Sequence, residues 1–245
     1  IITNLLWDDG VMHQNKGEIS INTLYGNDEL STQKGMFFRS FIQPTSVTIS
    51  DSIWKIAPGK VKFNKENAEF QNLSFNHAEQ ALSINGRLSK ELGDSLHVDL
   101  KKIDLAYVLN LIKFHAVEFS GEVSGEANLI GNRDSINGLA ILDVENFKFN
   151  DSPMGPAKVI GRWNNKQKNI ELEADMGEPG KYRTQVNGYI SPVQKGLDLH
   201  IKSQKTDIRF LNKYVTGIFK DLTGHTTGEI RLFGPFKKLD FVGDE

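Results

Sequence analysis

The sequence predicts an all-β fold with two short helices, in which a mostly antiparallel sheet dominates. Apolar and polar residues alternate with a period of two over most of the 245 residues, a pattern typical of strands with one sheltered and one solvated face. Turn-forming residues recur roughly every 8–12 residues, a spacing that favours hairpins. A stretch of about fifty residues also occurs twice, which indicates a repeated sheet unit rather than a compact enzyme fold.

The alternation assigns the apolar residues of each strand to one face of the predicted sheet. In NIELEADM, for example, Ile170 and Leu172 lie on the face opposite Glu171 and Glu173. A second sheet, a covering helix or a trough curled around its own apolar face would each shelter such a surface, and the pattern alone leaves these alternatives open. The residues that we expect to line a hydrophobic groove, or else an ordinary β core, are Leu82, Ile84, Leu88, Leu96, Val98, Leu100, Ala127, Leu129, Ile170, Leu172, Ala174, Met176, Leu197, Leu199, Ile201, Ile230 and Leu232.

The repeat is clearest in two glycine-punctuated segments, FSGEVSGEANLIG at 119–131 and LTGHTTGEIRLFG at 222–234. Their first glycines, Gly121 and Gly224, are 224 − 121 = 103 residues apart. The similarity extends backwards, so that 82–131 and 185–234 both read as strand, strand, helix, strand. Gly125 and Gly228 fall in mid-strand, where glycine is typical of a bulge or a bend. We expect 1–245 to be a single elongated β-repeat segment of a larger protein.

Two segments depart from the strand pattern and predict amphipathic helices. IDLAYVLNLIKF, residues 103–114, has apolar residues at i, i+3, i+4 and i+7, with Asp104 as a candidate N-cap. TDIRFLNKYVTGIFKDL, residues 206–222, has the same periodicity. Each helix precedes one copy of the glycine motif, as the re-entry of a repeated unit into its sheet would require.

Composition excludes several classes of function. The net charge is −2 with both signs interspersed, so no basic stripe is available to bind nucleic acid. The chain has no cysteine, which removes disulfides and thiolate metal sites. No apolar run approaches the ~20 residues of a transmembrane helix. The sequence opens on a strand-like segment without a starting Met or a signal peptide, and we expect it to be part of a longer polypeptide.

No motif for catalysis or metal binding stands out. The six histidines show no HxH or HExxH spacing. Ser52 and Lys55 match S-x-x-K, but the other motifs of the serine acyl-enzymes that use this pattern are missing. Carboxylate pairs such as Glu171 and Glu173 project from the solvated face. We therefore predict no catalytic residue, no metal site and no enzymatic activity.

Several segments resemble the TamB family of Gram-negative envelope proteins. The segment TDIRFLNKYVTGIFKDLTGHTTGEIRLFG shows the order of helix, small residue and glycine, Gly-Glu and alternating strand that is found in the C-terminal region of that family. DSIWKIAPGKVKFNKENAEFQNLSFNHAEQALSINGRLS and GLAILDVENFKFNDSPMG are also similar to it. The resemblance runs from about residue 46 to the end of the chain.

This resemblance implies a fold, a function and a location. The TamB family belongs with the AsmA-like proteins, which are similar to the bridge-like lipid-transfer proteins of eukaryotes. It implies an elongated sheet curled into a trough (a β-taco) with a hydrophobic groove for phospholipid acyl chains, in the periplasm and anchored to the inner membrane in the full-length protein. The implied roles are phospholipid transport between the two membranes and outer-membrane protein assembly with a BamA-like barrel protein. A chaperone-like module that adds a client strand to its edge and a purely structural β-repeat protein are the alternatives.

The tripeptide D-S-[I/L] occurs three times, and its serines are Ser52, Ser95 and Ser135. It resembles the acceptor signature of a general periplasmic O-glycosylation found in some Gram-negative bacteria, which would make these serines modification sites. Asp and Ser are also common at turns and strand starts, where all three copies are predicted to lie. Both interpretations stay open on the sequence.

Overall fold

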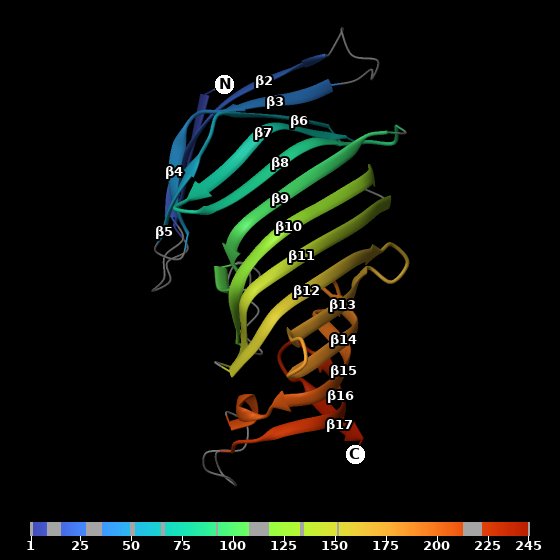
Figure 1. Cartoon of the computed structure of the whole chain (residues 1–245). Helices are drawn as coiled ribbons and strands as arrows, with labels where there is room; N and C mark the ends of the chain where they lie inside the picture. Colours follow the sequence, from blue (N-terminus) through green and yellow to red (C-terminus); the bar gives the residue numbers. More distant parts are fainter. Residues whose placement is uncertain are drawn as a thin grey trace. The chain divides into compact units, whose positions relative to one another are not determined.

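The strands account for nearly all of the secondary structure in the computed structural model (Figure 1), which describes residues 2–8, 16–27, 36–49, 52–64, 67–91, 93–107, 118–132, 135–150, 152–212 and 222–244. All seventeen strands belong to one mostly antiparallel, open sheet, which confirms the predicted fold class. The strands are β1 (Ile2–Asp8), β2 (Lys16–Asn27), β3 (Met36–Ile42), β4 (Thr45–Ile49), β5 (Ser52–Ile56), β6 (Gly59–Phe63), β7 (Ala68–His77), β8 (Gln80–Leu88), β9 (Ser95–Asp104), β10 (Phe119–Asn132), β11 (Ser135–Phe149), β12 (Ser152–Asn164), β13 (Asn169–Glu178), β14 (Tyr182–Ser191), β15 (Gly196–Asp207), β16 (His225–Pro235) and β17 (Asp240–Asp244), with a 3-10 turn η1 (Arg209–Leu211) between β15 and β16.

From β6 onwards the sheet is a meander in which each strand pairs with the next one in the sequence. Short turns suffice for this order, because antiparallel neighbours need no crossover. The turn Asn164–Asn169, for example, is fixed by the Asn164 side chain, whose Oδ1 accepts hydrogen bonds from the backbone N–H groups of Lys166 and Gln167 at 3.0 and 3.1 Å.

The N-terminal strands contain a hairpin that is interrupted on both sides. β3 pairs with β6 and β4 pairs with β5 in one continuous register, since Ile42 lies opposite Gly59 and Thr45 lies opposite Ile56. The residues between these pairs include Pro44 and Pro58. Proline has no N–H to donate to a ladder, so each proline splits one long strand into two short ones.

The chain divides into two compact units. Unit 1 comprises residues 1–102 and 126–138, and unit 2 comprises residues 103–125 and 139–245. The dividing line therefore runs through β10 and β11. Each unit has its own apolar residues, and the two are described separately below.

The repeat seen in the sequence is also a repeat of structure. β8, β9 and β10 correspond to β14, β15 and β16, and Lys102 and Lys205, which are 103 residues apart, both have a positive φ, of 48° and 53°. Shortly after each lysine an aspartate side chain accepts a hydrogen bond from the backbone N–H two residues later, at 2.8 Å for Asp104 and 2.9 Å for Asp207. Such Asx contacts favour a turn into helix over continued strand. Both copies of the repeat therefore leave the sheet through the same kind of side-chain hydrogen bond.

The predicted helices are seen only at their starts. Residues 105–107 are helical after β9, and η1 and residue 212 are helical after β15. The predicted N-cap Asp104 is confirmed, because residues 105–107 follow it as helix and its side chain accepts the Ala106 N–H. The second segment begins later than its predicted range, since residues 206–207 still belong to β15. The rest of both predicted helices, 108–114 and 213–221, lies outside the described residues.

The mid-strand glycines of the two motifs have different surroundings. A methyl group on Gly125 would lie 2.2 Å from the carbonyl oxygen of Ile141, so β10 and β11 could not approach as they do with any larger residue. Gly228 pairs with Ser203 next to a shift in the register between β15 and β16. Close approach and irregular pairing are the two reasons for which glycine is found inside strands.

Candidate functional site

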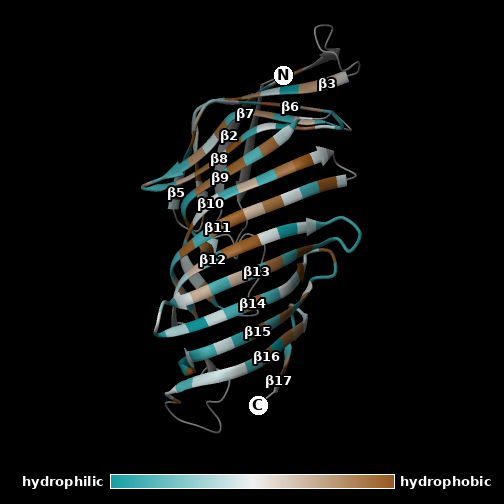
Figure 2. Cartoon of the chain, turned by 45° about the vertical axis from the view of Figure 1, so that its right-hand side comes forward, coloured by the Kyte–Doolittle hydropathy of each residue, from teal (hydrophilic) through white to brown (hydrophobic). Residues whose placement is uncertain are grey.

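One side of the sheet in unit 1 carries rows of apolar side chains, and we call it the apolar face of unit 1. Leu73 on β7 lies opposite Ile84 on β8, which lies opposite Val98 on β9. The next row is Phe75, Leu82 and Leu100. Polar and charged side chains such as Glu69, Arg87 and Asp99 alternate with these residues and point to the other side, and the resulting bands are visible along the strands in Figure 2.

Most of this face is only partly sheltered. The predicted lining residues of β8, β9 and β10 lie on the sheltered side of their strands, and among them only Leu96 is buried, at 6 % exposure. Phe38 and Phe63 belong to the same face and stack with ring centroids 5.3 Å apart, yet each remains 41 % exposed. The half-buried residues are Leu82, Ile84, Leu88, Val98, Leu100, Ala127 and Leu129.

One end of the same face is closed. Val47, Trp54 and Ile56 on β4 and β5 are buried, and the ring of Trp54 lies 5.5 Å from that of His77. A nitrogen of the His77 ring, Nδ1, is within 2.9 Å of the Ile53 carbonyl oxygen, which fixes the ring beside the tryptophan. Unit 1 therefore has an apolar surface that is buried at β4 and β5 and mostly half-buried along β8 and β9.

Unit 2 carries a second series of apolar rows, which we call the apolar face of unit 2. Leu172, Gly188, Leu199 and Leu232 follow one another across β13 to β16, and Ala174, Val186, Ile201 and Ile230 form the next row. All the predicted lining residues of unit 2 are buried or half-buried on this side: Ile170, Leu172, Ala174, Met176, Leu197, Leu199, Ile201, Ile230 and Leu232.

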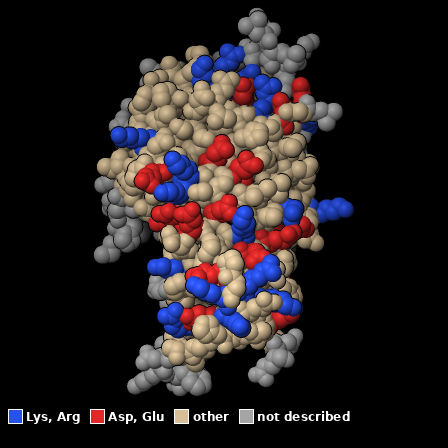
Figure 3. Space-filling view, in the orientation of Figure 1, with Lys and Arg blue, Asp and Glu red and all other residues tan. Residues whose placement is uncertain are grey.

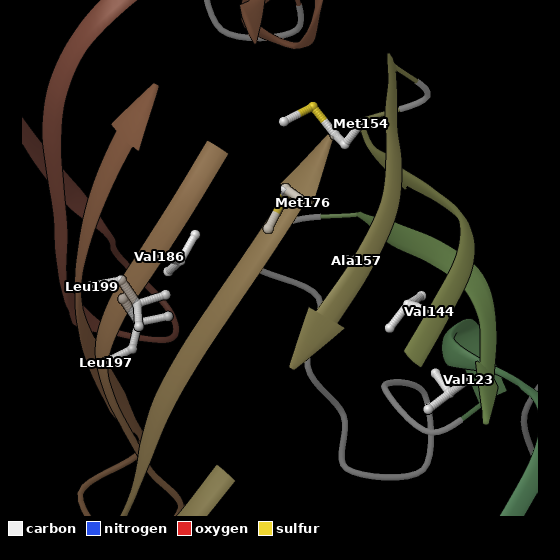
Figure 4. Close-up of a cluster of buried hydrophobic side chains, with 8 residues drawn as sticks. All are labelled: Val123, Val144, Met154, Ala157, Met176, Val186, Leu197 and Leu199. Carbon is white, nitrogen blue, oxygen red and sulfur yellow. The ribbon is translucent and has the colours of Figure 1, made fainter. Parts of the chain in front are cut away.

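Unlike the face of unit 1, the apolar face of unit 2 is filled by its own side chains. Figure 4 shows eight buried residues from β10 to β15 that point toward one another: Val123, Val144, Met154, Ala157, Met176, Val186, Leu197 and Leu199. β12 and β15 approach within 8 Å of each other, although three strand spacings separate them in the sheet. Strands in a flat sheet at that separation would be roughly 14 Å apart, so the sheet of unit 2 curls over its own apolar face.

The packed face of unit 2 ends in a buried cluster of hydroxyl groups. Thr184, Ser203 and Thr206 are 2 %, 7 % and 1 % exposed. The Oγ1 atoms of Thr184 and Thr206 are 2.6 Å apart and share one hydrogen bond, in which one hydroxyl donates and the other accepts. Thr184 also lies directly opposite Ser203 across β14 and β15. These three residues were not predicted as site residues, because in the sequence they look like ordinary polar positions of alternating strands.

Some apolar residues of unit 1 were also missed by the sequence reasoning, and the reason is structural. Phe70 and Leu73 both belong to the apolar face although they are three positions apart, because the register of β7 and β8 shifts between them. Asn72, in the shifted segment, has a φ of 55° and donates its N–H to Asn85 Oδ1 at 2.6 Å. The bulge interrupts the period of two, so the alternation in AEFQNLSF is hidden.

The opposite side of unit 2 is a charged surface made of ion pairs. Lys and Arg side chains lie beside Asp and Glu side chains over the lower strands of the view in Figure 3, and neither sign predominates. Arg231 makes two hydrogen bonds to the carboxylate of Asp198, at 2.6 and 2.9 Å, and Lys202 Nζ lies 2.8 Å from Glu229 Oε1. The Arg231 guanidinium holds the pKa of Asp198 below its usual value, as Lys202 does for the pKa of Glu229.

These pKa shifts predict that unit 2 loses stability in acid. Because the folded pKa of Asp198 is depressed, its contribution to stability is present at neutral pH and is lost as the pH falls below about 4. We expect the melting temperature to fall in that window, and Arg231→Gln to lower it at pH 7 by only roughly 1–3 °C, because the Arg231 side chain is 48 % exposed and water screens the pair. The variant should also show a smaller acid-induced drop than the parent, whereas Lys166→Gln, in an exposed turn, should follow the parent. Parallel pH profiles for the parent and Arg231→Gln would contradict this assignment.

A polar hollow of about 510 Å³ lies on unit 1, lined by residues of β7, β8 and the turn before β9. Arg87 bridges Glu69 and Asp94 at 3.1 and 3.7 Å, and Asp94 accepts a 2.5 Å hydrogen bond from the Ser89 hydroxyl. The guanidinium is thus engaged by both carboxylates, and the charged residues of the lining sum to −1, so the hollow offers no free cation to an anionic ligand. Among the described residues, no group of three or more His, Cys, Asp or Glu side chains is placed to hold a metal ion.

The three serines of the D-S-[I/L] tripeptides all begin strands. Ser52, Ser95 and Ser135 are the first residues of β5, β9 and β11, and Ser135 is the most exposed of them. The Ser95 hydroxyl lies 3.2 Å from His97 Nε2. O-glycosylation of these serines stays a prediction, and intact mass of native protein would test it.

Two further observations bear on what the faces can do. In the described part of the chain, no helix is both long and apolar enough to cross a membrane. Comparisons with known proteins add no relative, since no protein-family model, no curated protein and no solved structure matches this chain.

Proposed function

We propose that this chain is a non-enzymatic lipid-binding segment that holds phospholipid acyl chains on an apolar face of its sheet. Its full-length protein would act in the periplasm, anchored to the inner membrane, as a conduit for phospholipid between inner and outer membrane, and/or in outer-membrane protein assembly with a BamA-like barrel protein. The observation that carries the proposal is the apolar face of unit 1, with continuous rows of large apolar side chains that are mostly only half-buried, and with Phe38 and Phe63 exposed beside them. The resemblance to the TamB family supports the location and the partner.

Leaving such a face in contact with water costs free energy. Soluble monomers rarely expose contiguous apolar patches larger than a few hundred Å². Transfer of an acyl chain from water to an apolar wall is favourable by about 0.8 kcal/mol for each buried CH₂ group. Because Leu, Ile, Val and Phe line the rows without an interposed charge, a chain would meet nearly the same environment at each step along the face. Movement of this kind needs binding surface and no catalytic residue.

The direct test is a charge placed on the face. We expect Val98→Glu to lower the amount of phospholipid that co-purifies with the protein at least about tenfold, because a carboxylate would have to be desolvated beside each acyl chain. Val98 is half-buried, so the variant should still fold. The matched control is His97→Glu, which adds the same group at the neighbouring position, on the exposed side of β9.

Lipid extraction followed by mass spectrometry gives the measurement, and circular dichroism checks the fold. Equal lipid content in the parent, Val98→Glu and His97→Glu would remove the proposal. So would a parent protein that carries no lipid after gentle purification and acquires none from vesicles.

A second candidate function, strand addition to a client protein, is favoured by β17. Among the described residues β17 pairs with β16 alone, and its Phe241 and Val242 are 70 % and 59 % exposed. An apolar edge strand of this kind can accept a further strand. A photo-crosslinker at Val242 would then capture a client β-strand, whereas one at Val98 would capture lipid.

A further inference from the structure

The two copies of the repeat allow the same structural positions to be compared in unit 1 and unit 2. Leu82 and Thr184 are equivalent, at an offset of 184 − 82 = 102, and so are Leu100 and Ser203, at 203 − 100 = 103. In each copy the two residues lie directly opposite each other on adjacent strands. An apolar pair in the first copy is therefore a hydroxyl pair in the second.

A third position shows the same exchange in the sequence. Thr206 corresponds to Ile103, again at an offset of 103, although Ile103 already belongs to unit 2 and is buried there as Thr206 is, at 6 % against 1 % exposure. Three apolar side chains of the first copy are thus replaced by three small hydroxyl side chains in the second. The exchange is confined to one end of the rows, since Val98 and Ile201, Ala127 and Ile230, and Leu129 and Leu232 are apolar in both copies.

The exchange coincides with a difference in packing. In unit 1, Leu82 and Leu100 are half-buried, and so are Ile84 and Val98 beside them. In unit 2, Thr184 and Ser203 are buried, and the neighbouring Val186 is buried with them. The hydroxyls of Thr184 and Thr206 are joined by a hydrogen bond of 2.6 Å. Small side chains that need no water allow the sheet to close, whereas leucines at the same positions would occupy the space between its walls.

We propose that the units have different roles: acyl chains bind along the apolar face of unit 1 and are excluded from unit 2, where Thr184, Ser203 and Thr206 let the sheet close on its own side chains. This inference rests on the proposed function and adds where on the chain the lipid binds and which residues decide it. A hydrocarbon chain in unit 2 would have to displace buried Met176 and Leu199 and separate the paired hydroxyls, which would then have no partner. Binding of a hydrocarbon chain to the apolar face of unit 1 requires no such rearrangement.

The test compares equivalent positions in the two units of the full 245-residue chain. Because the chain has no cysteine, Val98→Cys and Ile201→Cys each provide one site for a bimane fluorophore, and Ala127→Cys and Ile230→Cys provide a second matched pair. All four residues are half-buried on strands of their unit. The probe is phosphatidylcholine with a doxyl group on its acyl chain, supplied as small vesicles, and melting curves identify any variant that does not fold.

We expect the lipid to quench more than half of the fluorescence at Val98→Cys and Ala127→Cys, and less than a tenth at Ile201→Cys and Ile230→Cys. Similar quenching in both units, or stronger quenching in unit 2, would overturn the division of roles and leave the proposed function standing. No quenching at any position would overturn the proposed function itself, and the inference with it.

The determinants are tested by exchanging them. Thr184→Leu combined with Ser203→Leu and Thr206→Ile gives unit 2 the residues of the first copy, and should raise the quenching at Ile201→Cys to the level seen at Val98→Cys. The reverse exchange, Leu82→Thr with Leu100→Ser, should reduce the quenching at Val98→Cys at least twofold. If either set of substitutions left the protein folded and its fluorescence quenching unchanged, these residues would not decide where lipid binds.

Discussion

Gly188→Ala should unfold unit 2, whereas the same substitution two strands away should be tolerated. Gly188 lies in β14 with a φ of +151°, and a methyl group there would lie 2.0 Å from the Asp198 carbonyl oxygen and 2.9 Å from Leu199 Cα. Both obstacles are backbone atoms of the adjacent strand, so no side chain can move aside. The conformational strain and the clash together should lower the free energy of unfolding by about 3 kcal/mol or more.

The matched control is Gly161→Ala. Gly161 and Gly188 lie on either side of Leu172 in the same row of unit 2. A methyl group on Gly161 would make ordinary contacts, at 3.4 Å with Ile170 Cγ2 and 4.0 Å with Ala140 Cβ. Urea unfolding followed by circular dichroism should show a midpoint near that of the parent for Gly161→Ala and a much lower one for Gly188→Ala. Similar midpoints for the two variants would show that β14 and β15 are not as close as described.

Leu199→Lys is the second substitution from which we expect a large loss. The Leu199 side chain is 8 % exposed inside the packed face of unit 2. Truncation of a buried leucine costs about 2–5 kcal/mol, and an unpaired ammonium group at the same place adds a desolvation cost. We expect a cooperative loss of unit 2 at temperatures where the parent protein is folded, measured as a fall in melting temperature.

His200→Lys is the control for that substitution. It places a lysine at the next position of β15, on the charged side, where the His200 side chain is 69 % exposed. Its melting temperature should stay close to that of the parent. If Leu199→Lys also melted like the parent, the apolar face of unit 2 would be open to solvent, and the description of that face as packed would be wrong.

The sequence predicted the strands well where the alternation is regular and poorly where the backbone is not. NIELEADM and GLDLHIKS alternate strictly, and they became β13 and β15 with the expected residues sheltered. The bulge at Asn72 moved Phe70 and Leu73 onto one face, although their spacing does not suggest it. Tertiary hydrogen bonds such as the one between Asn72 and Asn85 decide such shifts, and a local pattern does not contain them.

The difference between the two apolar faces could not be predicted from the sequence, for another reason. Leu96 and Leu199 belong to equivalent strands with the same alternation, and both are buried, yet their neighbours Ile84 and Val186 differ in burial. Alternation reports which side of a strand is apolar, and it does not report how far the sheet curls. The curl depends on the volume of side chains across the face, at positions such as Thr184 and Leu82, which only the structure brings into register.

The interrupted hairpin of unit 1 gives its sheet a crease. Gln43 and Pro44 in one long strand lie opposite Pro58 and Ala57 in the next strand. No ladder pairing joins the two strands at these positions, and the same register continues on both sides of them. Ala57 remains tied to β7 by its N–H, which bonds the Ser74 carbonyl oxygen at 3.0 Å. Bending along that line breaks no hydrogen bond between β3–β4 and β5–β6, whereas bending elsewhere in this hairpin would. The neighbouring strands β2 and β7 each pair with both halves of this hairpin, so they carry the sheet across the line where the ladder is missing.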